Sequence, residues 1–306
     1  MKDMSGLPRQ PLAEVFGYPI NNLSPNAERH RRLKLCPFNN KVPNCTKSRA
    51  ENPIGVCSVY DANQSATVTC PIRFREDWYI VEHAAAFFFL QGTNFTTLTE
   101  VRLNDKYGKT AGNIDIVLVS YDDAGRLMDF GSLEVQAVYI SGTISTPFNH
   151  YIADPTKNAN LDWRRHKNYP RPDYLSSSRK RLAPQLIYKG GILHAWHKKM
   201  AVAVDTQFFA TLPSMEEVDK DEADFAWLVY DLRHDHTENL KRLTLTHTIY
   251  TRFGPALDRI TKSEPGEVHD FVDLLQTKLD EVLTMGTSVG TTPDAVSLQD
   301  SNEVIE

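Results

Sequence analysis

Two apolar runs near the middle of the chain, at 114–121 and 127–138, are separated by a short polar segment that contains Asp-Asp-Ala-Gly. Runs of this length and composition are typical of β-strands, and a polar break that contains Gly is typical of a turn. The sequence therefore predicts a β-hairpin. Any fold of this chain has to be built around that pair of strands.

Further elements are expected on both sides of the hairpin. Residues 76–91 crowd apolar side chains together and are followed by Gly92 at a C-cap position, which predicts a helix. A second helix is expected at 184–199, although Gly190 and Gly191 could break it. Three more strands and a last helix are expected at 200–212, 226–235, 242–253 and 268–283. The pattern predicts an α+β fold with a mixed sheet and flanking helices.

The only cysteines of the chain lie within 35 residues: Cys36, Cys45, Cys57 and Cys70. Four thiolates suit a tetrahedral Zn or Fe site, which stabilises a loop-rich segment that lacks a core of its own. No Cys-x-x-Cys pair is present, so four unrelated buried thiols remain an alternative. Disulfides are not expected, because no apolar secretory segment follows Lys2 and the cytoplasm, where we expect the protein, is reducing.

Acidic residues occupy places in the predicted hairpin where an apolar strand does not need them. Asp115 opens the first strand, and Glu134 and Gln136 lie two residues apart, on one face of the second. Carboxylates on adjacent strands can hold Mg²⁺ against a phosphate, and phosphodiester hydrolysis depends on such metals. The alternative is that all three are ordinary solvent-facing strand positions.

The net charge of −5 conceals two halves of opposite sign. Residues 1–213 hold 26 Lys and Arg against 19 acidic residues, whereas residues 214–306 hold 8 against 20. The basic excess is concentrated at 28–49 and 162–199. Clusters of this kind are typical of phosphate-binding surfaces, and a solvated basic face is the alternative.

The chain is expected to divide into four parts. Residues 1–28 form a Pro- and Asn-rich N-terminal segment, residues 29–75 a loop-rich metal module, and residues 76–283 a core that includes a DNA-binding segment at 162–199. Residues 284–306 form an acidic tail that is expected to be disordered. The longest apolar run is far shorter than the roughly 20 residues of a membrane span.

Short strings in the first half of the chain resemble the NotI-type restriction endonucleases. They are C-P-F from Cys36, G-V-C ending at Cys57, C-P from Cys70 and F-G-S-L-E-V-Q at 130–136, in the family's order. The resemblance implies an α/β/α nuclease core of the PD-(D/E)XK superfamily, Mg²⁺ at the active site with Mn²⁺ as a substitute, and Fe rather than Zn in the four-cysteine site. It also implies a bacterial homodimer that cuts a palindrome and works beside a cognate DNA methyltransferase.

Carried over position by position, the resemblance implies a catalytic set of Glu100, Asp115, Glu134 and Gln136. Asp115, Glu134 and the main-chain carbonyl of Val135 are then expected to bind the metal, with Glu100 in a second or outer position. Gln136 stands where most of the superfamily has Lys, and an amide can orient the attacking water but cannot supply a charge. The residues expected to bind DNA are Arg164, Arg165, Lys167, Arg171, Arg179, Lys180, Arg181 and Lys189.

The function expected from these features is that of a type II endonuclease cutting double-stranded DNA at a GC-rich palindrome such as CGGCCG. Two alternatives remain from the residues themselves. A four-cysteine DNA-binding regulator explains the cysteines and basic segments but leaves the acidic residues of the hairpin without a purpose. A repair nuclease that acts on DNA structure rather than on sequence is the other.

Overall fold

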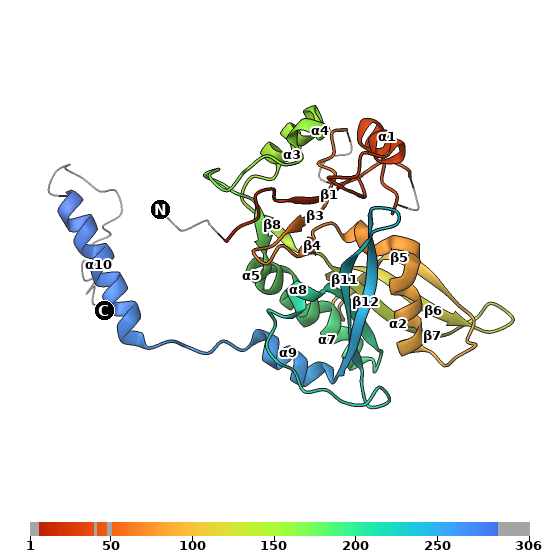
Figure 1. Ribbon diagram of the computed structural model, residues 1–306. Coiled ribbons are helices and arrows are strands. Elements are labelled where there is room, and N and C mark those ends of the chain that lie inside the picture. Colours follow the sequence, from red (N-terminus) through yellow and green to blue (C-terminus); the bar gives the residue numbers. More distant parts are fainter. Residues whose placement is uncertain (1–5, 40–41, 48–50, 287–306) are drawn as a thin grey trace, which may run out of the picture. The chain divides into compact units, whose positions relative to one another are not determined.

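The computed structural model describes residues 6–39, 42–47 and 51–286. The chain divides after Thr261 into two compact units. The first unit contains two principal sheets and their helices, and the second contains one helix (Figure 1).

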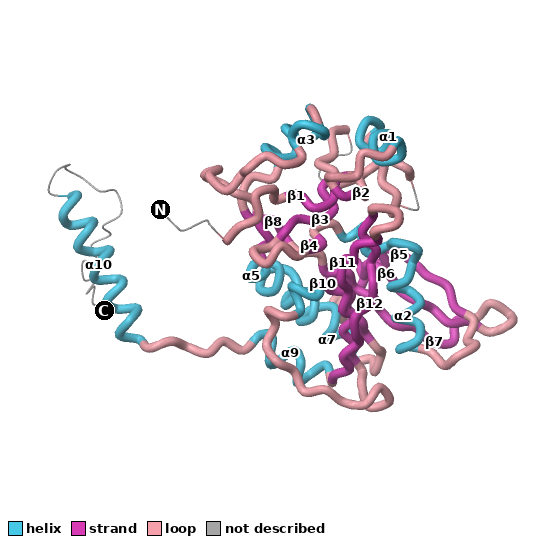
Figure 2. Tube along the Cα trace, viewed as in Figure 1, coloured by secondary structure: helices cyan, strands magenta, loops and turns pink. Residues whose placement is uncertain are grey.

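A six-stranded mixed sheet forms the centre of the first unit (Figure 2). Its strand order is β12-β11-β10-β7-β6-β5. Strands β5, β6 and β7 form an antiparallel meander, β10 is parallel to both β7 and β11, and β12 is antiparallel to β11. The bounds are Phe95–Asn104 (β5), Thr110–Tyr121 (β6), Leu127–Gln136 (β7), Met200–Asp205 (β10), Phe225–Asp235 (β11) and Leu240–Thr251 (β12). The predicted hairpin is confirmed as β6 and β7.

Helices cover both faces of this sheet. On one face, α2 (Tyr79–Phe88) packs its apolar side chains against Ala201 and Ala203 of β10. On the other face, Val202 and Val204 pack against leucines of the segment 174–195 and against α9 (Phe253–Thr261). Because successive strand residues point to opposite faces, a strand covered on both sides has to be apolar throughout. The mixed sheet with flanking helices is therefore confirmed.

The segment 174–195 is helical throughout, with two π-helical turns in it. It consists of α5 (Tyr174–Ser177), η2 (Ser178–Leu182), α6 (Ala183–Gln185), η3 (Leu186–Gly190) and α7 (Gly191–Ala195). The predicted start at residue 184 was wrong by ten residues, and Gly190 and Gly191 do not break the helix. A Cβ atom on Gly190 would lie 2.5 Å from the ring of Phe253, so glycine permits close helix packing here.

The helix predicted at 76–91 is shorter than expected. A 3-10 segment, η1 (Pro71–Trp78), precedes α2, and Asp77 and Trp78 have left-handed backbone angles that end it. At the other end Phe89 is already extended, so Gly92 lies in a later turn and does not cap the helix. The chain leaves the helix early because Phe89 and Phe95 turn back to pack on each other.

The N-terminal part of the chain contributes a second sheet, of order β2-β1-β3-β4. Its strands are Leu12–Val15 (β1), Tyr18–Pro19 (β2), Val56–Tyr60 (β3) and Ala66–Val68 (β4), and α1 (Pro25–Leu33) lies between β2 and β3 in the chain. The expected boundary at residue 28 therefore passes through this sheet, because β1 pairs with β3. Ser24 caps α1 by accepting a hydrogen bond from the N–H of Ala27.

The remaining elements connect these layers. The helices α3 (Ser145–Ala153) and α4 (Pro155–Asn158) lie between β8 (Tyr139–Ser141) and β9 (Arg171–Asp173) in the chain, and these two strands pair with each other. The short helix α8 (Thr206–Phe209) follows β10 within the run predicted as a strand. It begins there because the Asp205 carboxylate accepts hydrogen bonds from the N–H groups of Gln207 and Phe208.

The second unit contains α10 (Val268–Gly286), where the predicted helix is confirmed. The first residues of the expected acidic tail, 284–286, belong to this helix, and the rest of the tail lies outside the described residues. None of the helices in the described ranges combines the length and apolarity needed to cross a lipid bilayer.

Candidate active site

Three acidic residues occupy one row across adjacent strands of the central sheet. The β5–β6 register pairs Thr99 with Ile116 and Val101 with Ile114, which places Glu100 opposite Asp115. The β6–β7 register pairs Ile116 with Leu133, and its continuation places Asp115 opposite Glu134. The sequence predicted the members of this row, and the sheet brings their backbone positions together.

Asp115 is fixed by the strand beside it. Its Oδ2 accepts a hydrogen bond from the N–H of Val135 at 2.8 Å. A charged carboxylate that accepts a main-chain N–H is a strong, directional contact. The bond holds the Asp115 side chain against β7, next to Glu134.

Glu134 has no exposed surface. Its Oε2 accepts a hydrogen bond from Nζ of Lys189 at 2.8 Å, and its Oε1 is buried without a hydrogen-bond partner among the described residues. Burial, and then the neighbouring charge of Asp115, raise the pKa of Glu134 to about 8, although Lys189 acts in the opposite direction. A buried carboxylate oxygen without a partner is costly and calls for a ligand such as a metal ion.

Gln136 shares the face of β7 that carries Glu134. Parallel pairing sets Glu134 beside Val202 and Gln136 beside Val204, so both side chains point towards the helical segment 174–195. The Nε2 group of Gln136 donates to the carbonyl of Ala137 at 2.7 Å. Neither residue faces solvent, in contrast to the alternative considered from the sequence.

Glu100 differs from its neighbours in the row because it is exposed. Its φ of 56° puts it in the left-handed region, which residues other than Gly rarely occupy in a strand. Strained backbone of this kind is often found at functional sites. Glu100 therefore lies opposite Asp115 on β6, one strand further from Glu134, and is exposed.

Most of the chain matches a known protein family. The family model of the restriction endonuclease NotI matches residues 14–243, which include both sheets up to β12. The chain belongs to the NotI restriction endonuclease family. The family consists of site-specific DNA-cleaving enzymes, so a DNA-hydrolysing function follows from membership. No curated protein matches the sequence significantly.

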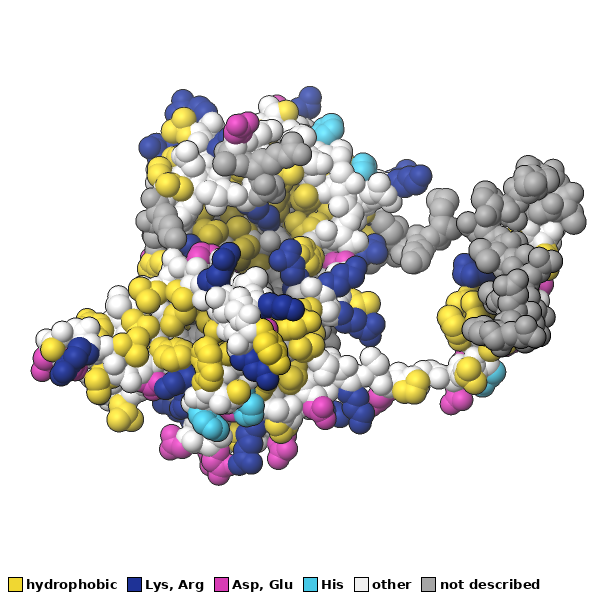
Figure 3. Space-filling model, turned by 180° about the vertical axis from the view of Figure 1, so that it is seen from behind, with side chains coloured by type: hydrophobic (Ala, Val, Ile, Leu, Met, Phe, Trp, Pro, Cys, Tyr) yellow, Lys and Arg dark blue, Asp and Glu magenta, His cyan; other side chains and the backbone are white. Residues whose placement is uncertain are grey.

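The basic residues that we expected to contact DNA have two different environments in this NotI-family chain. Six are exposed: Arg165, Lys167, Arg171, Arg179, Lys180 and Arg181. Arg164 is half-buried and forms an ion pair with Asp162 at 2.5 Å, and the guanidinium of Arg181 lies 4.7 Å from the ring centre of Tyr139. Figure 3 shows Lys and Arg side chains gathered across the middle of one face of the protein.

Lys189 lies apart from these surface cations. It is only 5% exposed, and its ammonium reaches Glu134 rather than solvent. Its charge alone had suggested a DNA contact. One signal was available: Lys189 shares its helical face with Leu182, Leu186 and Leu193, all of which are buried.

The four cysteines are free thiols; Cys57 lies in β3 of the N-terminal sheet, and Cys36 and Cys45 pack at the apolar cluster of β1 and β3. Burial raises the pKa of the Cys36 thiol to about 11, N–H groups of Phe38 and Asn39 lower it, and Cys70 and Cys45 raise it further. Burial likewise raises the pKa of Cys57, followed by the charges of Cys70, Glu14 and Cys36. Main-chain N–H groups directed at Cys36 and Cys45 suit thiolate ligands.

Among the described residues no three His, Cys, Asp or Glu side chains converge closely enough to hold a metal ion. The donor sets nevertheless fit the two metals that the family resemblance implies. The cysteines offer thiol ligands, which suit Fe or Zn, and the strand row offers carboxylates with one unpartnered oxygen, which suit Mg²⁺.

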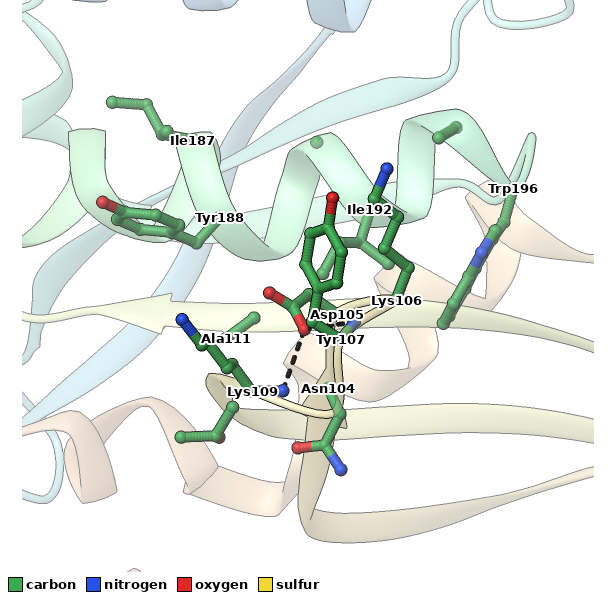
Figure 4. Close-up of a pocket in the computed structure, with 13 residues that line it drawn as sticks. Asn104, Asp105, Lys106, Tyr107, Lys109, Ala111, Ile187, Tyr188, Ile192 and Trp196 are labelled. Atoms are coloured by element: carbon green, nitrogen blue, oxygen red, sulfur yellow. Dashed lines mark hydrogen bonds between the residues drawn. The ribbon is translucent and has the colours of Figure 1, made fainter.

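A hollow of about 680 Å³ lies between the β5–β6 turn and the helical segment 174–195. Figure 4 shows Tyr107 on the turn side and Tyr188 and Trp196 on the helix side, while Asp105 closes the turn by accepting from the N–H of Lys109. The lining is largely apolar and holds none of the three carboxylates, so the hollow is not the catalytic centre.

Proposed function

We propose that the chain is a type II restriction endonuclease with a PD-(D/E)XK core that makes double-strand breaks at a specific DNA site. The observation that carries the proposal is the row of Glu100, Asp115 and Glu134 across three adjacent strands, with a buried carboxylate oxygen left without a partner. A DNA-binding regulator has no need of such a row. The resemblance to NotI-type restriction endonucleases implies a GC-rich palindromic recognition site, so CGGCCG is the site we propose.

Asp115, Glu134 and the carbonyl of Val135 would hold the catalytic Mg²⁺, for which Mn²⁺ can substitute, with Glu100 in an outer position. When bound, the ion polarises the phosphate and lowers the pKa of the attacking water. The protein contributes orientation: the N–H of Val135 fixes Asp115, and burial keeps Glu134 free of competing water. Gln136 would orient the attacking water through its amide.

The exposed arginines and lysines of the segment 162–199 would bind the DNA. Cations on one face can track phosphates, and Arg can also read the O6 and N7 atoms of guanine through paired hydrogen bonds. A palindrome has twofold symmetry, so a homodimer matches it with one active site for each strand. A cognate methyltransferase would protect the host's own sites.

The four cysteines would bind one Fe, or alternatively Zn, as a scaffold rather than as a catalyst. Cys36 and Cys45 adjoin the apolar cluster of β1 and β3 in the N-terminal sheet. A closed tetrahedral site has no open position for substrate. The metal would therefore stabilise the fold.

Digestion of a long plasmid with added Mg²⁺ tests the proposed function. We expect discrete bands, because a sequence-specific endonuclease cuts at a few fixed positions, and no cleavage in chelator. A smear would indicate a nuclease without sequence specificity, such as a repair enzyme, and intact DNA would indicate a regulator. The band lengths also map the site and so test CGGCCG directly.

A further inference from the structure

We infer that Lys189 is the cationic positioning residue of the active site, in place of the lysine that β7 lacks at position 136. It acts through Glu134, whose Oε2 its ammonium holds at 2.8 Å while Oε1 is left without a partner. This inference rests on the proposed function, since it assigns a role within the same site. Lys189 is thereby assigned to the catalytic centre and not to the DNA-contacting surface.

The environment of Lys189 argues against a surface role. A buried ammonium loses its hydration, and an ion pair with good geometry is needed to offset that loss. The partner here is a fully buried carboxylate, whereas the DNA-binding candidates Arg179, Lys180 and Arg181 on the same helical segment are all exposed. A side chain kept 5% exposed is a poor contact for a phosphate backbone.

The fold holds the Lys189 side chain in one place. Its stem passes over Gly112 of β6, where an added Cβ would come within 3.2 Å of Cε of Lys189. The next residue, Gly190, packs against the ring of Phe253 at the start of α9, so the backbone at this point is held against that helix. Lys189 also lies in the π-helical turn η3, and such turns occur frequently at functional sites. The contact over Gly112, the packing of Gly190 and the π-helical turn together restrain the Lys189 side chain, whose ammonium bonds Glu134.

The two fixed carboxylates show what this ammonium can do. The N–H of Val135 holds Oδ2 of Asp115, and Lys189 holds Oε2 of Glu134. Each bond restrains one side chain, and the unpartnered Oε1 of Glu134 is left for a ligand. Gln136 cannot serve in this way, because its amide is neutral and donates to the carbonyl of Ala137. A fixed cation in a buried site also stabilises the negative charge that develops on the phosphoryl group.

The test uses Lys189→Met, an apolar replacement of similar length, with Lys241→Met as the control. Lys241 is a half-buried lysine near the start of β12, and its ammonium lies 5.7 Å from the ring centre of Tyr60. Three quantities are measured for each protein. The first two are the single-turnover cleavage rate in Mg²⁺ and the affinity for a cognate duplex in chelator. The third is the binding of Ca²⁺ in the absence of DNA, which is monitored as a shift in melting temperature.

We expect Lys189→Met to cut at least about a hundredfold more slowly, to bind DNA in chelator within about twofold of the parent, and to bind Ca²⁺ more tightly. The tighter Ca²⁺ binding follows because a cation that repels the ion has been removed. The control should match the parent in all three. Near-parental cleavage, weaker or unchanged Ca²⁺ binding, or a loss of DNA affinity that accounts for the slower cleavage would each overturn the inference.

A second variant separates a positioning role from a merely structural one. The double substitution Lys189→Met with Gln136→Lys returns a lysine to the same face from β7, and we expect it to regain at least about tenfold of the lost rate. If Lys189→Met does not fold, Lys189→Gln replaces it, because the amide can still donate to Glu134 while the charge is lost. If the parent itself leaves DNA intact, the proposed function fails, whereas the Ca²⁺ measurement still decides whether Lys189 controls the carboxylates.

Discussion

The guanidinium of Arg73 donates to the carboxylate of Glu14 at 3.2 Å, and neither side chain is exposed to solvent. The same guanidinium binds Glu76 at 2.7 Å and donates to the main-chain carbonyl of Lys241 at 2.7 Å. Ser58 donates to the other side of Glu14. Arg73 therefore links β1 and β3 of the N-terminal sheet to β12 of the six-stranded sheet, which carries the candidate active site.

Replacing Arg73 with Met should lower the free energy of unfolding by about 3–5 kcal/mol, because it leaves the buried Glu14 without its counter-ion and Glu76 with Arg242 alone. Denaturation in urea measures the change. Arg126→Met is the matched control, since Arg126 pairs with Asp122 but its side chain is 79% exposed, and it should change stability by less than about 1 kcal/mol. Equal effects of the two substitutions would contradict the role given to Arg73.

Glu134→Ala should abolish cleavage while it preserves specific binding. The substitution removes a proposed metal ligand, whereas base readout depends on side chains elsewhere. We expect a loss of several orders of magnitude in rate and a duplex affinity in chelator that is equal to the parent's or tighter. The exposed Glu222→Ala serves as control. Near-parental cleavage by Glu134→Ala would remove this residue from the catalytic set.

The purified protein should contain about one Fe or Zn per chain, held by Cys36, Cys45, Cys57 and Cys70. Elemental analysis of folded, active protein measures it directly. Cys57→Ser should reduce solubility or melting temperature before it affects the chemistry of any protein that still folds. Folded and active protein without such a metal would refute the assignment, and chelator that stops cleavage should leave this metal in place over the same minutes.

The sequence was sufficient for the features that depend on local periodicity. The period of two in β6 and β7, with a Gly-containing turn, predicted the hairpin, and the spacing of Glu134 and Gln136 put both on one face. This part of the candidate site could be predicted because neighbours in a hairpin are near in sequence. The position of Asp115 opposite Glu134 also depends on an irregularity between Ser120 and Tyr121, which shifts the register by one residue and was not predicted.

The remainder depends on contacts between distant residues. Lys189 lies 55 residues from Glu134, and only the packing of its helical segment on the sheet shows that they meet. Gly190 looks like a helix breaker until the ring of Phe253 explains the missing side chain. Likewise, residues 12–15 gave no strand signal of their own, because their strand is defined by pairing with β3. Charge alone therefore misplaced Lys189 among the surface cations.

Replacing both Arg179 and Arg181 with Ala should weaken duplex binding and reduce its salt dependence. Each phosphate contact contributes about 0.9 to the slope of log affinity against log salt, so the double variant should lose about 1–2 in slope. Titrations at several salt concentrations measure it. The double substitution of Arg252 and Arg259 by Ala, two exposed arginines outside the segment 162–199, is the control. An unchanged affinity and slope would exclude Arg179 and Arg181 from the interface.

The stability of the metal-free protein should depend on pH through Glu134. Its folded-state pKa, raised by burial and by Asp115 to about 8, lies above the ordinary value of 4.5, so the folded state binds this proton more tightly than the unfolded state. The stabilising contribution is complete below about pH 4.5 and is lost as the pH rises towards 8. Glu134→Gln has no such proton to lose.

Glu134→Gln should therefore gain stability relative to the parent by about 2 kcal/mol between pH 5 and 7, measured by urea denaturation in chelator. Asp205, whose pKa burial raises to about 7, titrates in both proteins and cancels in the comparison. Saturating Ca²⁺ should reduce the difference, because a cation at Glu134 stabilises the ionised carboxylate that the variant lacks. A constant difference across this range would mean that Glu134 is ionised in the metal-free fold, held in that state by Lys189.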